Sequence, residues 1–282
     1  MGFEKRTLGR TGFSVAPLGL ASGYGTDAAM VEKAVDHGVN YLYWGAWRSK
    51  RMAEGIKKVS KINREDLVIV VQSMARTVFS MSRIVRSSLR LLGADYLEVL
   101  LIGMGGSNKI PSRQLVDNAY RLKNKGLIRS LGISSHNRLL FCELEKEKHF
   151  DIFHIRYNAA HRGAEIEVLD NLPKEGGPGV VTFTSTRWGS LLNSSNIPFG
   201  DSPPTAVDCY RFVLSHPGIH VAVCAPNSME QLKEDLRVLE LGPMKEEEME
   251  RMRRIGDHVY KKESPLKAQL KSLRSLRLKR RK

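Results

Sequence analysis

The segment LVIVVQSMARTVFSMSRIVRSSLRLLGADYLEVLLI, residues 67–102, contains two short apolar runs on either side of a longer amphipathic stretch. Its two ends, residues 67–71 and 97–102, have the length and the branched apolar composition of buried strands. Residues 81–92 carry apolar side chains at helical spacing, which predicts an amphipathic helix. A strand, a helix and a second strand in this order predict a right-handed crossover unit of a parallel sheet.

The same alternation continues along the chain in both directions. Six further apolar runs are predicted to be strands: residues 18–20, 41–43, 130–134, 151–155, 180–183 and 221–223. Seven further stretches are predicted to be helices: residues 27–37, 50–60, 113–125, 137–148, 164–172, 205–216 and 228–239. Because eight strand–helix units over this length fit a closed barrel better than an open sheet, we predict an α/β fold, the (β/α)8 TIM barrel.

The N-terminal segment differs from the repeating units. FEKRTLGRTGFSVAPLGL, residues 3–20, predicts a β-hairpin that turns around Gly9–Gly12 and closes the bottom of the barrel. No linker divides the chain, so the barrel is predicted to occupy residues 1–258 as one domain. Residues 259–282 are predicted to be a basic C-terminal extension.

Composition restricts the class of protein. Hydrophobic residues make up 41% of the 282-residue chain, yet no apolar run approaches the ~20 residues that span a bilayer. The N-terminus is charged and lacks an apolar signal segment. The cysteines, Cys142, Cys209 and Cys224, are far apart and form neither a metal-ligand spacing nor a disulfide framework. These features predict a cytoplasmic protein.

The net charge of +15 is concentrated at the C-terminus. Residues 261–282 contain ten Lys or Arg and one Glu, which leaves +6 for the remaining 260 residues. Leu266, Leu270, Leu273 and Leu278 recur near one face at helical spacing. One interpretation is a basic amphipathic helix that binds nucleic acid or an anionic membrane surface. The other, which we favour because terminal charge runs are usually solvated, is an end whose leucines pack on the barrel.

Four segments together resemble the aldo-keto reductases, in an order and spacing that extend from about Arg6 to Arg253. They are RTLGRTGFSVAPLGLAS (residues 6–22), GLIRSLGISSHN (126–137), DIFHIRYNAAHRGAE (151–165) and SHPGIHVAVCAPNSMEQLKEDL (215–236). The resemblance implies a barrel that binds NADP(H) and transfers a hydride to a carbonyl group. The alkoxide that develops must then be protonated.

The resemblance also identifies four catalytic positions, which in the family hold Asp, Tyr, Lys and His. Here these positions are Tyr43, Arg48, Gln72 and Gly103, so all four have changed chemical class. This chain therefore lacks the residues that the family uses for proton transfer. Three functions remain open. The first is a carbonyl oxidoreductase with a non-standard mechanism. The second is a catalytically inactive member, a pseudoenzyme, that binds a dinucleotide or another anion as a sensor or scaffold, and the third is a nucleic-acid- or membrane-binding protein in which the basic tail has the main role.

Tyr43 and Arg48 are the candidate catalytic residues. They lie five residues apart in NYLYWGAWRSKRM, residues 40–52, at the expected mouth of the barrel. A guanidinium within ~4–6 Å of a phenol favours the phenolate, so we predict that Arg48 assists Tyr43 in donating the proton. The alternative is that Tyr43 fills space and that Arg48 is a solvated charge on the rim.

The resemblance places NADP(H) along one side of the mouth. It assigns the nicotinamide to Ser134, His154 and Asn158, the pyrophosphate to Arg187, and the adenosine end to Asn227, Gln231, Glu234 and Asp235. Ordinary structural roles compete with these assignments: His154 fits a core histidine and Asn158 fits a turn cap. A substrate pocket is predicted from Trp44, Trp47, His136 and Trp188, whose rings suit an aromatic or anionic small molecule. The identity of the substrate and the choice between NADP and NAD stay open.

Overall fold

The computed structural model describes residues 2–23, 25–45, 48–107 and 109–279, and side chains as far as Lys262. Eight parallel strands follow one another around a closed barrel, and the last strand pairs with the first. They are β3 (Leu18–Ala21), β4 (Tyr41–Trp44), β5 (Val68–Ser73), β6 (Leu97–Gly105), β7 (Ile128–Ser135), β8 (Ile152–Arg156), β9 (Gly179–Phe183) and β10 (Val221–Cys224). The predicted (β/α)8 barrel and its eight strands are confirmed.

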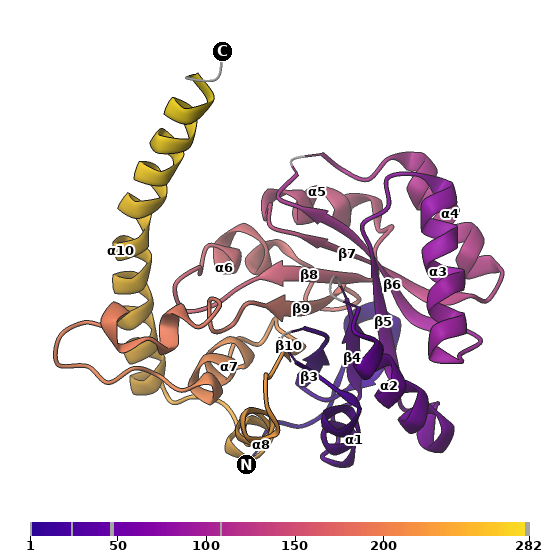
Figure 1. Ribbon diagram of the computed structural model, residues 1–282, viewed down its shortest axis with the longest axis horizontal. Helices are drawn as coiled ribbons and strands as arrows, with labels where there is room; N and C mark the ends of the chain where they lie inside the picture. Colours follow the sequence, from indigo (N-terminus) through magenta and orange to yellow (C-terminus); the bar gives the residue numbers. More distant parts are fainter. Residues whose placement is uncertain (1, 24, 46–47, 108, 280–282) are drawn as a thin grey trace.

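The helices surround the barrel (Figure 1). They are α1 (Ala28–Asp36), α2 (Lys50–Asn63), α3 (Val78–Leu92), α4 (Arg113–Asn124), α5 (Leu139–Glu147), α6 (Ala164–Glu167), α7 (Ala206–Leu214), α8 (Met229–Leu236), α9 (Val238–Leu241) and α10 (Glu246–Lys279). The helix predicted over residues 164–172 is shorter, because Val168 leaves the helical backbone region at φ −129°. The helix predicted over residues 228–239 is divided into α8 and α9 at Arg237.

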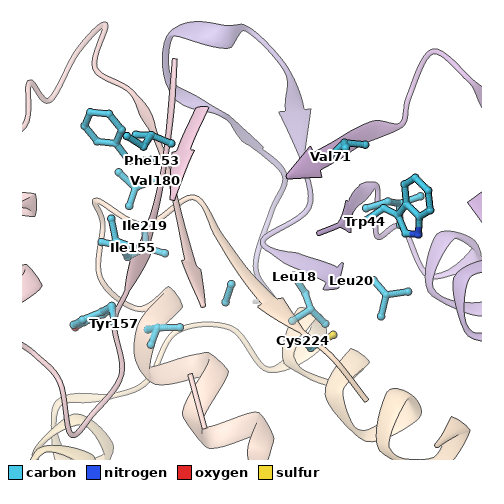
Figure 2. Close-up of a cluster of buried hydrophobic side chains, with 14 of the residues drawn as sticks. Leu18, Leu20, Trp44, Val71, Phe153, Ile155, Tyr157, Val180, Ile219 and Cys224 are labelled. Atoms are coloured by element: carbon cyan, nitrogen blue, oxygen red, sulfur yellow. The ribbon is translucent and has the colours of Figure 1, made fainter. Parts of the chain in front are cut away.

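The strands bury both of their faces. Outward side chains such as Leu18, Leu20 and Phe153 pack between the barrel and the helices (Figure 2). Inward side chains such as Tyr41, Val70 and Val181 fill the barrel. Because successive strand residues point to opposite faces, each position along a strand determines whether its side chain can reach the barrel mouth.

The N-terminal hairpin consists of β1 (Arg6–Thr7) and β2 (Ser14–Val15), which pair antiparallel. Between them, Leu8 is fully buried and belongs to the cluster inside the barrel. A Cβ on Gly9 would overlap the backbone at Gly179, the first residue of β9, so glycine is required for this close approach. The hairpin therefore lies against the N-terminal end of the barrel, as predicted.

The helix α10 joins the barrel to the basic extension. Its first half packs through Met249, Met252, Ile255 and Val259, which are all buried. The second half extends away from the barrel (Figure 1). The boundary predicted at residue 258 therefore falls within one continuous helix, and the leucine side chains of residues 266–278 lie outside the described residues. Across the part of the chain that the structure describes, no helix has the length and apolar composition needed to cross a bilayer.

Candidate functional site

A cavity of about 860 Å³ lies at the carboxyl ends of the strands. Loops after parallel strands converge at this end of a barrel, which is where barrel enzymes build their sites. The cavity runs from the mouth of the barrel to α8 and the loop before it. Its walls include Tyr43, Gln72, Met74, Ser134, His136, His154, Phe183, Thr184, Ser185, Thr186, Trp188, Tyr210, Asn227, Gln231, Glu234 and Asp235.

The floor of the cavity contains a hydrogen bond between two of the replaced catalytic positions. The Tyr43 hydroxyl donates to Gln72 Oε1, and the Gln72 amide donates to Met74 Sδ at 3.1 Å. Tyr43 reaches Gln72 because both side chains point into the barrel from neighbouring strands. Where the family has an Asp and a Lys, this chain therefore has a contact between two neutral groups, and Gln72 brings no positive charge to the tyrosine.

The position of the family's histidine is filled by neighbouring side chains. A Cβ built on Gly103 would overlap Gln72 Nε2 and Met74 Sδ. A side chain could occupy this position only if Gln72 and Met74 moved. Three of the four replaced positions are therefore packed against one another, and no single substitution would restore the family's arrangement.

The structure separates Arg48 from Tyr43, contrary to the predicted pairing. Arg48 is exposed, its guanidinium carbon lies 5.8 Å from the centre of the Trp44 ring, and its Nη1 donates to Ser88 Oγ at 3.5 Å. The cause is strand alternation. Tyr43 points into the barrel, whereas the next residue, Trp44, points outward, and Arg48 lies against the Trp44 ring. Arg48 is a charge on the rim.

Trp44, the last residue of β4 and a predicted pocket residue, does not line the described cavity. Trp44 is buried between the barrel and the helices, and its Nε1 donates to the Ser49 carbonyl at 2.9 Å (Figure 2). It seals the core and does not line the pocket. Trp47 lies outside the described residues.

The predicted nicotinamide end contains Ser134 and His154, which both line the cavity. His154 is 1% exposed, and burial lowers its pKa to about 3, so the imidazole is neutral. Its Nε2 lies 2.6 Å from the Tyr41 hydroxyl, whose pKa is raised by burial and then by Tyr43. The Tyr41 hydroxyl and the neutral imidazole therefore satisfy each other through one hydrogen bond. His154 is thus both a satisfied core histidine and part of the cavity wall.

Asn158 and Arg187 lie behind the cavity, contrary to their predicted places along the cofactor. Asn158 is fully buried; its amide donates to the Thr184 carbonyl at 2.8 Å, and its Oδ1 accepts from the backbone of Ala160 and His161. Arg187 is also buried, with its Nη1 2.6 Å from His161 Nδ1. Neither side chain lines the cavity, because each is engaged by backbone or side chains on the other side of the loop.

The loop after β9 has an unusual backbone where it lines the cavity. Thr184, Arg187 and Trp188 have φ angles of 61°, 53° and 52°, a left-handed conformation that is rare for β-branched and bulky residues. The Asn158 amide holds this loop through Thr184. Next to Thr184, Ser185 is 2% exposed and its Oγ has no hydrogen-bond partner among the described residues. Strained backbone and an unsatisfied hydroxyl in a cavity wall are typical of a ligand site.

The predicted adenosine end and two predicted pocket residues line the cavity. Asn227 lies in the loop before α8, and Gln231, Glu234 and Asp235 lie along α8; His136 and Trp188 also line the cavity. Asp235 is 4% exposed, and burial followed by the charge of Glu234 raises its pKa to about 7. A ligand at this end would therefore meet a carboxyl group that is half protonated near neutral pH.

Several cavity residues were not predicted in the sequence analysis, and Phe183, Ser185 and Tyr210 are examples. Phe183 and Ser185 lie at the end of β9 and directly after it, so the rule that sites follow strands could have found them. Tyr210 lies in the middle of α7, and only the packing of that helix against the barrel mouth brings it to the cavity. No sequence signal identifies it.

Comparison with known proteins adds information on the fold. No family model and no curated protein matches the chain. Among solved structures, it is similar to aldo-keto reductase AKR11C1 from Bacillus halodurans in the apo form, with 22% identity, a TM-score of 0.73, and coverage of 89% of this chain and 95% of that one. The holo form of the same protein has 20% identity and a TM-score of 0.74, with coverage of 89% of this chain and 96% of that one. PA4992 of Pseudomonas aeruginosa has 21% identity and a TM-score of 0.66, with coverage of 83% of this chain and 93% of that one.

Proposed function

Starting from a chain that has the barrel fold of the aldo-keto reductases, we propose that it binds a nicotinamide dinucleotide, with NADP(H) as the first candidate. The observation that carries the proposal is one continuous cavity that includes Ser134 and His154 at one end and Asp235 at the other. These are the two ends of the site that the sequence predicted. A dinucleotide is long enough to occupy both.

The middle of the cavity suits phosphate groups. The Ser185 hydroxyl is buried without a partner among the described side chains, so it is available to a phosphate oxygen. The helices α7 and α8 begin beside the cavity, where Thr205 and Asn227 line it, and helix N-termini favour anions. Arg187 contributes its positive charge from behind the loop and does not contact the phosphate groups directly in this arrangement.

The group that would protonate the product is less well supported than the cofactor site. A bound NADPH would supply a hydride; the chain itself must orient the ring and protonate the product. The Tyr43 hydroxyl, on the cavity floor, is the group we propose as donor. Since its hydrogen-bond acceptor is the neutral Gln72, we expect slow carbonyl reduction compared with an enzyme that has a cation at this position.

The alternative is a dinucleotide- or anion-binding protein without catalysis, acting as a sensor or scaffold. The packing of Gln72 and Met74 into the space beside Gly103 favours it, because this packing occupies the place of the family's histidine. Dinucleotide binding is common to both alternatives, so it is the first property to test.

Titration with NADPH and with NADP+ should give saturable binding in the micromolar range or weaker. Trp188 is 60% exposed in the cavity wall, so ligand binding should quench tryptophan fluorescence. In Trp188→Phe the quenching should shrink while the calorimetric heat remains. The absence of heat and quenching at millimolar NADPH, which corresponds to about −4 kcal/mol, would exclude dinucleotide binding.

A second role is proposed for the basic extension. Residues 261–282 carry +9, and α10 extends away from the barrel, so we propose that this segment binds nucleic acid or an anionic membrane surface. Such binding is electrostatic and carries no sequence specificity without a reader motif.

Removal of residues 261–282 should leave the melting temperature almost unchanged and weaken binding to nucleic acid and to anionic vesicles. The truncated chain keeps the buried residues of α10 and Tyr260, whose ring packs edge-on against His161. Full-length protein should lose affinity steeply with added salt, as counterion release requires. A full-length variant in which the ten Lys and Arg residues of 261–282 are changed to Gln separates the effect of their charge from the effect of shortening the chain. Unfolding of the truncated chain would show instead that the leucines belong to the core.

A further inference from the structure

Arg156 is the last residue of β8 and lies on the inner face of the barrel. Ile152 and His154, four and two residues earlier in the strand, face the barrel interior, whereas Phe153 and Ile155 face the helices. By the alternation of the strand, Arg156 continues the inner face at the mouth. Among the described strand residues on that face, it alone carries a formal charge.

The charge of Arg156 is not compensated. The side chain is half-buried, its Nε is buried without a hydrogen-bond partner, and it forms no ion pair with any described residue. Burial lowers the pKa of Arg156, and the nearby guanidinium groups of Arg138 and Arg187 lower it further. Each of those two has its own partner: Arg138 donates to Glu167 at 2.8 and 2.9 Å, and Arg187 contacts His161.

Arg156 is not one of the residues that line the cavity in this structure, but it lies next to the aromatic part of the cavity wall. The strand register pairs it with Phe183, whose ring centre lies 5.2 Å from that of His136 in an edge-to-face contact. Phe183, His136 and Trp188 line the cavity. Burial lowers the pKa of His136, and the charge of Arg156 lowers it further. This imidazole is therefore neutral at pH 7 and does not repel the guanidinium of Arg156. A ligand lying against these rings would have Arg156 at its outer end.

We propose that Arg156 binds the carboxylate or phosphate group of a small organic anion whose apolar part lies against Phe183, His136 and Trp188. A carboxylate matches the planar fork of the guanidinium, and its negative charge would offset the repulsion from Arg138 and Arg187. The net positive charge of the chain would attract such a ligand. This inference rests on the proposed use of the cavity as a ligand site and identifies an anionic substrate class for it.

Calorimetric titration with 2-naphthoate and with the uncharged 2-naphthamide tests the proposal. Wild-type protein should bind the carboxylate at least roughly tenfold more tightly than the amide, the difference expected for one charge-assisted pair. Arg156→Met should remove this preference, and Arg156→Lys should keep part of it. Arg113→Met, which removes the same charge from the exposed face of α4, should behave as wild type. Titration with 2-naphthyl phosphate asks whether phosphate is accepted equally well.

Two results would overturn the inference: equal affinities for carboxylate and amide in wild-type protein, or a preference that survives in Arg156→Met. Parallel NADPH titrations separate this inference from the proposed function. Unchanged NADPH affinity in Arg156→Met supports an anionic substrate site. A parallel loss of NADPH affinity would assign Arg156 to the dinucleotide phosphates and overturn the inference. A carboxylate preference in a chain that does not bind NADPH would leave the anion site standing and reject the proposed function.

Discussion

Tyr43→Phe should lower NADPH-dependent turnover by ~10²–10⁴-fold on any aldehyde, ketone or quinone that the wild-type protein reduces. The variant removes the hydroxyl that lies on the cavity floor and keeps the ring. Tyr210 also lines the cavity, but burial and the charge of Asp235 raise its pKa well above 10, so it is a poor replacement donor. The measurement is the initial rate of NADPH oxidation over a panel of such carbonyl compounds.

Two further variants show whether the tyrosine acts as an acid. Arg48→Met should leave turnover unchanged, because Arg48 is exposed and its described contacts are with Trp44 and Ser88. Gln72→Lys should raise turnover, since it would place a cation next to the hydroxyl. If Tyr43→Phe retains wild-type turnover, Tyr43 has no role in proton transfer. A wild-type protein that binds NADPH and reduces nothing would favour the sensor or scaffold function.

Asp235→Asn should stabilise the protein at neutral and alkaline pH by roughly 4 kcal/mol, the value of a shift of about three pKa units. The carboxyl group is buried, and its pKa is raised to about 7 by burial and by Glu234, while the Cys224 thiol partly offsets this. Ionised, it is a buried charge that has no cationic partner among the described residues. The amide has nearly the same shape and avoids that cost.

The pH dependence follows from the direction of the shift. An unfolded Asp releases its proton near pH ~4, whereas folded Asp235 holds it to about pH 7. Over this interval the folded state binds more protons, so the free energy of unfolding of the wild-type protein falls as pH rises. The stability gained in Asp235→Asn should therefore grow between about pH 4 and pH 7 and then level off.

Denaturant unfolding of both proteins at several pH values measures this difference directly. Glu234→Gln is the matched control: Glu234 is exposed, so its own burial cost is small, and it should gain only the part that comes from its repulsion of Asp235. A gain for Asp235→Asn that is the same at all pH values would show that Asp235 titrates normally.

The sequence by itself determined the barrel, its eight strands and the N-terminal hairpin. Apolar runs and helical spacing are local signals, and they survive folding because each strand must bury both faces and each helix one. The same signals located the set of residues that follow the strands. The resemblance to the aldo-keto reductases added four positions, 43, 48, 72 and 103, and comparing residue types there needs no knowledge of where each side chain points.

Only the tertiary structure decided which of those residues meet in the cavity. Strand alternation sends Tyr43 inward and Trp44 outward, so Arg48 follows Trp44 to the rim. Beyond a strand, direction depends on backbone angles that no local pattern specifies. Left-handed angles at Arg187 and Trp188 put one side chain behind the loop and the other in the cavity wall. Asn158 and His161 hold that loop from a segment distant in sequence, and such contacts exist only once the barrel has closed.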